Sequence, residues 1–163
     1  MCNIVSNSSP LIFLSKIGRL DVLTQIFNKV YIPYAVYEET VLSHKTDDAA
    51  SQIAHFVTKG QIIQFNVQNE LAVKALSGRL HPGEVQVIIG ASELGIKEVI
   101  LDDLHARNKA EQFDLNSIGT LGILRIAYKK GIIKDFKSDI AMLMNVDFRI
   151  SSTLLQRILD DLN

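Results

Sequence analysis

The sequence has a single cysteine, Cys2, and no long hydrophobic run. One thiol cannot build a disulfide framework or a cysteine-based zinc site, and it fits a reducing, cytoplasmic setting. No apolar run approaches the roughly twenty residues that a membrane-spanning helix needs, and the N-terminus lacks the basic-then-apolar pattern of an export signal. These absences predict a cytoplasmic protein with no membrane contact.

Charge of one sign is also lacking, because 17 Lys and Arg side chains stand against 18 Asp and Glu side chains, leaving a formal net charge of −1. The whole chain therefore has no electrostatic footprint for nucleic acid, and any basic surface must be a local patch. Glycine is missing after the first predicted strand, where residues 7–10 read NSSP. A nucleotide-binding α/β protein needs a glycine-rich phosphate loop there, so that class is disfavoured. A phospho-acceptor receiver domain is weaker again, since that fold needs an acidic pair at this point.

What the chain does contain is an alternation of short apolar strands and helical stretches. Its 163 residues, 47% of them apolar and 21% charged, suit one globular domain over residues 1–163. The alternation predicts an α/β fold, with three α/β/α layers and a central parallel sheet of four to five strands flanked by helices. Strands are expected at residues 3–6, 30–32, 62–65, 99–101 and 115–118. Helices are expected at 20–27, 47–59, 70–76, 121–130, 138–144 and 151–162, with others beginning near Pro10, Pro33 and Glu84 and after Asp103.

The middle of the chain has the clearest pattern of acidic residues at the ends of predicted helices and strands. A turn at residues 82–83 puts Glu84 in the first turn of a helix, where the helix dipole favours a carboxylate. The apolar run 99–101 predicts a strand covered on both faces, and it ends in Asp102 and Asp103. Ligands of open α/β sheets bind beyond the carboxyl ends of the strands, so acidic side chains at this edge could do chemistry.

Oxygen-bearing side chains elsewhere stand at comparable positions. Asn7 ends the first predicted strand, and Glu38 and Glu39 lie in the helix after the second. Each also has a purely structural explanation: Asn7 can be a turn residue or a helix N-cap, and the two glutamates can form a solvated helix face. Periodicity leaves open which of Glu38 and Glu39 faces the sheet.

The remaining acids have equally plain alternatives. Glu84 can be only a favourable charge at a helix start, worth about 0.3–1 kcal/mol, and Asp102 or Asp103 can cap the next helix. Taken together, however, these positions would bring side-chain oxygens to one edge of the sheet. Clustered carboxylates repel one another, so a cation is needed to hold them. Oxygen-only ligands suit Mg²⁺ or Mn²⁺, and the implied chemistry is phosphodiester hydrolysis by a metal-activated water.

Five segments, in this order, resemble the PIN domain, the nuclease fold of VapC-type toxins, and more closely an uncharacterised PIN-like branch of bacteria and archaea. They read VSNSSPLIFLSKIGRLDVL from residue 5, IPYAVYEE from residue 32, HPGEVQVIIGASELG from residue 81, ILDDLHAR from residue 100 and IGTLGILRIAYKKGII from residue 118. The resemblance implies a parallel sheet flanked by helices, a metal site of three or four acids, and cleavage of RNA.

The resemblance also implies roles for single residues. The metal ligands for Mg²⁺ or Mn²⁺ would be Asn7, Glu39, Glu84 and Asp102. The catalytic acids would be Glu39, Glu84, Asp102 and Asp103, because a one-residue shift would exchange the two aspartates. The resemblance places the hydroxyl that accompanies the first ligand on Ser9, a candidate substrate contact. From their positions near the acids, and not from the resemblance, His105 and Arg107 could contact substrate phosphate, as could Arg79 and Lys109. A solvated helix face explains these basic side chains equally well.

Asn7 departs from the family pattern, which has an aspartate at this position. An amide oxygen can still bind a hard cation, but it brings no negative charge. The formal charge of the four-residue site falls from −4 to −3, which should weaken metal binding. Weak activity, an altered metal dependence and complete loss of activity all stay open.

Two functional hypotheses follow. The first is a divalent-metal-dependent endoribonuclease, the toxin of a toxin–antitoxin pair, with RNA as substrate. The alternative is a catalytically weakened or inactive PIN-like module that binds nucleic acid or protein. By resemblance to VapC-type toxins, an antitoxin protein and a second copy of the chain, in a homodimer, are the expected partners.

Overall fold

The computed structural model describes residues 1–162, and over these residues the chain forms a five-stranded, all-parallel sheet. The strands are β1 (Ile4–Ser6), β2 (Val30–Pro33), β3 (Ile62–Phe65), β4 (Glu98–Ile100) and β5 (Asn116–Ile118). Their spatial order is β3-β2-β1-β4-β5. The predicted α/β fold with a parallel central sheet is therefore confirmed.

The first strand lies at the centre of the sheet because it is apolar on both faces. Ile4 and Val5 are fully buried, and Ile4 pairs with Val30 of β2 on one side and with Glu98 of β4 on the other. The chain builds outward from β1 in one direction through β2 and β3, then returns to add β4 and β5 on the other side. The crevice beyond the carboxyl ends of the strands at such a reversal is where open α/β sheets bind ligands.

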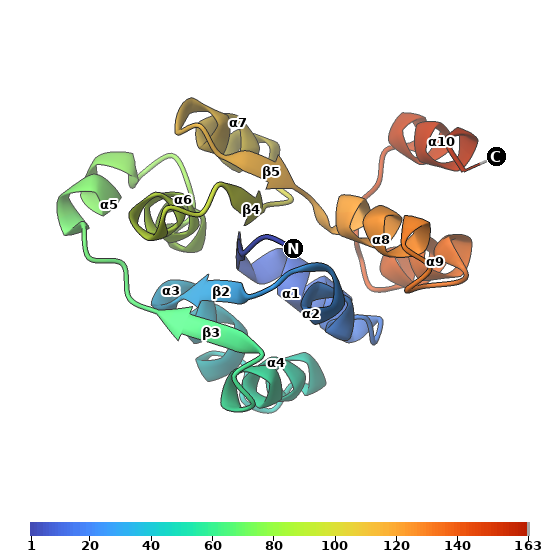
Figure 1. Cartoon of the computed structure of the whole chain (residues 1–163), viewed down its shortest axis with the longest axis horizontal. Helices are drawn as coiled ribbons and strands as arrows, with labels where there is room; N and C mark the ends of the chain where they lie inside the picture. Colours follow the sequence, from blue (N-terminus) through green and yellow to red (C-terminus); the bar gives the residue numbers. More distant parts are fainter. Residues whose placement is uncertain (163) are drawn as a thin grey trace.

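Helices cover both faces of the sheet (Figure 1). One group consists of α5 (Glu70–Leu76), α6 (Pro82–Leu94) and α7 (Leu104–Gln112), and α6 packs across β1, β2 and β4. The other group contains α1 (Ser8–Lys16), α2 (Asp21–Ile26), α4 (Asp48–Thr58), α8 (Thr120–Lys129) and α9 (Phe136–Asn145). The short α3 (Tyr34–Tyr37) follows β2, and α10 (Ser152–Asp160) ends the described chain.

Several element boundaries follow local signals in the sequence. Asp47 caps α4 by accepting a hydrogen bond from the backbone N–H of Ala49 at 3.1 Å. Gly95 ends α6 in a left-handed conformation with φ of 65°, which glycine adopts without steric cost. Strand β3 and helix α5 have the bounds that the sequence predicts. These signals are local, so they can be recognised without knowledge of the fold.

One local feature was not predicted. After α3 the helix widens into a π-helix over Glu38–Leu42. A π-turn has more residues per turn than an α-helix, so it changes which side chains face the sheet, and such turns are frequent at functional sites. Glu38 and Glu39 are the first two residues of this π-helix.

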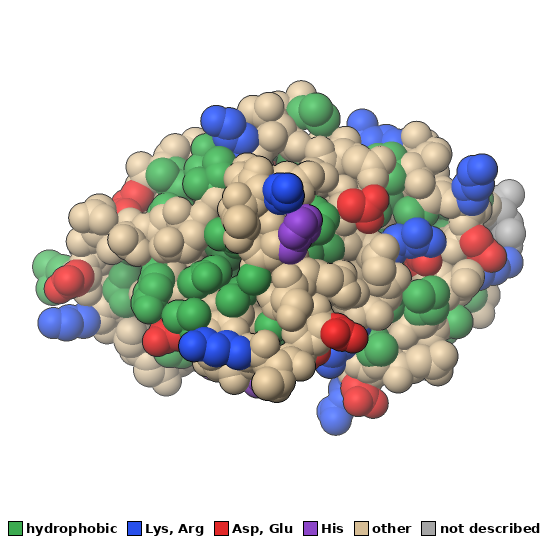
Figure 2. Space-filling model, turned by 90° about the horizontal axis from the view of Figure 1, so that it is seen from below, with side chains coloured by type: hydrophobic (Ala, Val, Ile, Leu, Met, Phe, Trp, Pro, Cys, Tyr) green, Lys and Arg blue, Asp and Glu red, His purple; other side chains and the backbone are tan. Residues whose placement is uncertain are grey.

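The surface carries no dominant charge of one sign on the face drawn in Figure 2, where acidic and basic side chains are interspersed and hydrophobic side chains gather toward one end. This matches the near-zero net charge of the chain. Among residues 1–162, no helix combines the length and the apolar character needed to cross a bilayer.

Candidate metal-binding site

Asn7 directly follows β1 and is the N-cap of α1, but its side chain does not cap the helix. The residue is only 7% exposed, and Oδ1 has no hydrogen-bond partner among the described residues. A buried oxygen left unsatisfied costs about 1–3 kcal/mol. Turn or capping chemistry therefore does not explain this side chain, whereas a ligand at Oδ1 would satisfy it.

Glu39 lies on the π-helix and is held at both of its carboxylate oxygens. Ser8 Oγ donates a hydrogen bond of 2.6 Å to Oε2, and His81 Nδ1 lies 3.1 Å from Oε1. Glu38, by contrast, is exposed to solvent. Of the two glutamates, Glu39 is thus the one that faces the end of β1.

Gly83 brings Asn7 and Glu39 to a common point. A methyl group placed on Gly83 would lie 2.9 Å from Glu39 Oε1, 3.2 Å from Glu39 Oε2 and 3.1 Å from Asn7 Oδ1. Gly83 is buried in the first turn of α6, and a larger residue at this position would crowd these three oxygens. The result is a cradle of side-chain oxygens between β1, the π-helix and the start of α6.

Glu84 is the next residue of α6, and its carboxylate turns back to accept a hydrogen bond from the backbone N–H of His81 at 3.1 Å. Burial raises the pKa of Glu84 above its ordinary value, the bond from His81 opposes this rise, and the negative charges of Asp103 and Glu39 add to it. The influence of these two carboxylates shows that Glu84 shares their electrostatic environment. A cation at the cradle would favour the ionised form of Glu84.

Asp102 lies two residues after the end of β4, and Thr120 fixes the orientation of its carboxylate. The backbone N–H of Thr120 donates to Oδ1 and its hydroxyl donates to Oδ2, both at 2.7 Å. Burial raises the pKa of Asp102, while the two Thr120 bonds and the positive charge of Arg107 oppose the rise. Asp102 is therefore a positioned carboxylate whose charge is partly compensated by neighbours from α7 and α8.

Asp103, the next residue, acts as a helix cap. It caps α7 by accepting a hydrogen bond from the N–H of Ala106 at 3.0 Å, and it is exposed. Arg107 is anchored by a 2.7 Å bond from Nε to the carbonyl of Leu101. Both residues line a cavity of about 690 Å³ together with Ser9 and Asp102, and the cavity is further bordered by Gly119, Arg125, Arg149 and Leu154.

The sequence-derived residues thus collect at one end of the sheet but in two parts. Asn7 and Glu39 meet at Gly83, whereas Asp102 and Asp103 lie at the adjoining cavity, with Glu84 electrostatically coupled to both groups. Within the described chain, no three His, Cys, Asp or Glu side chains form a ready-made metal cluster. Mg²⁺ usually binds through one or two carboxylates, with water and substrate phosphates completing its shell. The unsatisfied Asn7 oxygen and the Glu39 carboxylate fit that donor set.

Comparison with known families decides the classification. A family model described as a PIN domain matches residues 3–163. The chain belongs to the PIN-domain family. No curated protein matches it significantly.

Three residues of this PIN domain were not singled out by sequence reasoning. Ser8 donates to Glu39, where the resemblance had placed the accompanying hydroxyl on Ser9; Ser9 lines the adjoining cavity instead. Thr120 holds Asp102, and His81 contacts Glu39. The signal available for His81 was its position just before the Pro82 turn, and for Thr120 its position just after β5.

Replacing Thr120 with valine should destabilise the PIN domain. Valine has the same shape but no hydroxyl, so Asp102 Oδ2 would lose a partner in a site where Thr120 is fully buried. Hydrogen bonds to charged groups contribute about 1.5–3 kcal/mol, and we expect the free energy of unfolding in urea to fall by about that amount. Thr120→Ser keeps the hydroxyl and serves as the control. A valine variant as stable as the serine variant would contradict the role of this bond.

Proposed function

We propose that this protein is a cytoplasmic, divalent-metal-dependent ribonuclease of PIN type. Membership of the PIN family supports a nuclease fold, and PIN nucleases generally bind RNA. The observation that carries the proposal is the cradle at Gly83, where the buried, unsatisfied Asn7 oxygen and the Glu39 carboxylate converge. Glu84, Asp102 and Asp103 supply further negative charge at the same end of the sheet.

In this proposal, Asn7 and Glu39 would hold Mg²⁺ or Mn²⁺, with Glu84 and Asp102 as further donors. The ion would supply Lewis-acid activation of water and stabilise the negative charge that develops on the phosphate. Ser8 keeps the Glu39 carboxylate oriented toward the cradle, and Thr120 does the same for Asp102. Preorganised oxygens of this kind lose little conformational freedom when a cation binds.

The direct test is cleavage of a labelled single-stranded RNA by the purified protein in Mg²⁺, in Mn²⁺ and in excess chelator. We expect cleavage with either ion and none with the chelator. Glu39→Gln, purified in parallel, controls for contaminating nucleases and should be inactive. Cleavage that survives the chelator, or that is equal in the Glu39 variant, would contradict the proposal. Cation binding without cleavage would favour a PIN-like binding module that has lost catalysis.

The amide of Asn7, in place of a carboxylate, is the feature of the site expected to weaken metal binding. Asn7→Asp would add a carboxylate beside Glu39, and we expect the affinity for Mn²⁺ to rise at least about tenfold in calorimetric titration, because a charged oxygen replaces an amide oxygen. The metal-free variant should be less stable at neutral pH, because the new charge is buried and close to another carboxylate. The exposed Asn145→Asp on α9 is the control for charge alone. An unchanged Mn²⁺ affinity in Asn7→Asp would remove Asn7 from the ligand set.

The resemblance to VapC-type toxins supports a finer assignment as the toxin of a toxin–antitoxin pair, with an antitoxin protein as partner and a homodimer as the assembly. Light scattering coupled to size-exclusion chromatography tests the assembly. Growth arrest on expression of the wild-type chain, absent with Glu39→Gln, tests the toxin role.

A further inference from the structure

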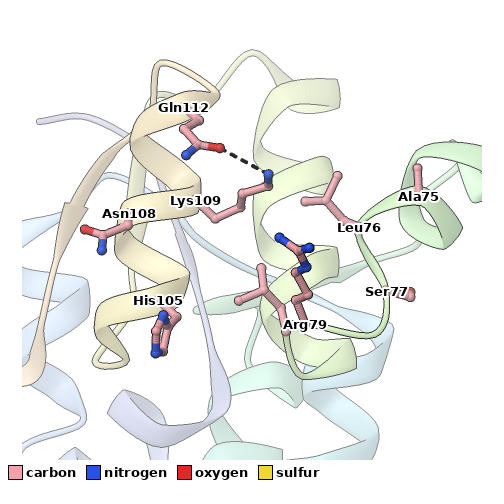
Figure 3. A pocket seen from close by; sticks show the side chains of 9 residues that line it. Ala75, Leu76, Ser77, Arg79, His105, Asn108, Lys109 and Gln112 are labelled. Atoms are coloured by element: carbon pink, nitrogen blue, oxygen red, sulfur yellow. Dashed lines mark hydrogen bonds between the residues drawn. The ribbon is translucent and has the colours of Figure 1, made fainter.

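A second groove lies on the far side of α7 from the Arg107 cavity. It occupies about 800 Å³ between α7 and the segment that joins α5 to α6. Figure 3 shows Arg79 and Lys109 extending into this space from opposite sides, with His105 at one end of it. Its full lining is Ala75, Leu76, Ser77, Arg79, Leu80, His105, Asn108, Lys109 and Gln112.

The charge of the groove is unlike that of the rest of the molecule. Its lining contains Arg79, Lys109 and His105, and no described acidic residue belongs to it. Arg79 takes part in no ion pair of the described chain, and Lys109 Nζ donates only to the side-chain oxygen of Gln112, at 3.1 Å. In a chain with a net charge of −1, two unpaired cations facing one cavity indicate a site for an anion.

The position of the groove connects it to the acidic site. Arg79 precedes His81, the neighbour of Glu39, by two residues, and His105 follows Asp103 by two. The groove therefore begins where the two acidic segments end. To enter the groove, an anionic chain whose reacting phosphate lay at the acids would continue along these two segments.

We propose that this groove binds the backbone of single-stranded RNA beside the scissile phosphate, with Arg79 and Lys109 each contacting one phosphate. The inference rests on the proposed ribonuclease function and names a subsite of it. Arginine donates in a fork that matches phosphate oxygens, and lysine acts as a mobile point charge. The groove is walled by α7 on one side and by the α5–α6 segment on the other, which suits a single strand tracked by a charged channel.

The polar residues of the groove fit the same ligand. Asn108 and Gln112 lie on the α7 wall, and Ser77 lies on the opposite wall. Amide and hydroxyl groups can donate to and accept from a ribose 2′-hydroxyl, which is the group that distinguishes RNA from DNA. Single-stranded DNA should therefore bind with the same dependence on Arg79 and Lys109 but more weakly.

The test measures binding separately from cleavage. Fluorescence anisotropy of a labelled single-stranded RNA is followed in excess chelator for the wild type, for Arg79→Gln/Lys109→Gln and for Lys129→Gln/Lys130→Gln. The control pair is exposed at the end of α8, away from the groove, and removes the same charge. We expect at least a tenfold loss of affinity for the groove variant and less than a twofold change for the control. The slope of log affinity against log salt should fall by about 1.4 for the groove variant, because each phosphate contact of a single strand contributes about 0.7.

Equal losses in the groove and control variants would overturn the inference, because they would reflect net charge alone. Unchanged RNA affinity in the groove variant would also overturn it, and weakened binding of a labelled poly-glutamate peptide by that variant would then favour a groove for an acidic protein segment. Neither result bears on whether the protein cleaves RNA, which the assay with metal and chelator decides. Cleavage that fails while the groove variant still loses RNA affinity would reject the nuclease and retain the groove.

Discussion

Glu84→Gln should lower the rate of RNA cleavage by at least about 100-fold and, at the same time, raise the melting temperature of the metal-free protein at neutral pH. Removing a group that only orients a metal ligand costs about 10–100-fold, so loss of a ligand should cost at least the upper end of that range. The stability gain follows from the raised pKa of Glu84, which shows that the fold disfavours its ionised form. Glutamine keeps an oxygen that can accept from the His81 N–H but has no charge to desolvate.

The pH dependence of this gain has a definite sign. Because the pKa of Glu84 is higher in the folded chain than in the unfolded one, the folded chain binds more protons between the two values. Stability contributed by this group is therefore lost as pH rises through that interval. The difference in melting temperature between Glu84→Gln and the wild type, both in chelator, should be small at acidic pH and grow toward neutral pH.

The exposed neighbour of Glu39 supplies a matched control for this experiment. Glu38→Gln removes the same charge from a solvated side chain, so it should change neither cleavage nor melting temperature. A Glu84→Gln variant that retains cleavage within threefold of the wild type would remove Glu84 from the reaction.

Gly83→Ala should weaken Mn²⁺ binding and RNA cleavage by about 10–100-fold while leaving the protein folded. The added methyl would occupy the space between Glu39 and Asn7, at 2.9 Å from one and 3.1 Å from the other, so the Glu39 carboxylate must move. Misplacing a reacting group by about 1 Å can cost 100-fold in rate. Gly83 does not need a left-handed conformation, and alanine favours a helix by about 1 kcal/mol over glycine. The fold therefore tolerates the change, and calorimetric titration with Mn²⁺ measures its effect on the site.

Gly90→Ala, two turns further along α6, distinguishes this effect from general crowding. A methyl on Gly90 would meet the ring of Phe65, which belongs to the packing of α6 on β3 and not to the oxygen cradle. This variant should melt at a lower temperature than the wild type and bind Mn²⁺ within twofold of it. Equal losses of Mn²⁺ affinity in the two variants would contradict the cradle.

The fold was predictable because its signals are short-range. Strands β1 and β4 lie within one residue of their predicted bounds, and α4 and α6 end beside Gly60 and Gly95 as predicted, because these signals are read from a few neighbouring residues. Strand order was not predictable, because it depends on how the crossovers pack. Only the structure places β1 between β2 and β4.

The candidate site was predictable in its residues but not in its contacts. Strand ends and helix starts located Asn7, Glu84 and Asp102, whereas periodicity could not choose between Glu38 and Glu39. That choice rests on the contacts of Glu39 with Ser8 and His81, which are distant from it in the sequence. The bonds from Ser8 to Glu39 and from Thr120 to Asp102 join residues 31 and 18 positions apart, so no local sequence pattern predicts them.

The bond from Thr120 to Asp102 also bears on the order of events during synthesis. The oxygen cradle draws on residues 7 to 83, but the carboxylate beside it is oriented only when residue 120 has left the ribosome and β5 has joined the sheet edge. A nascent chain that ends between residues 103 and 119 contains Asn7, Glu39 and Asp102 but lacks the two Thr120 bonds that orient Asp102. An early-terminated product of that length would have an incomplete pocket.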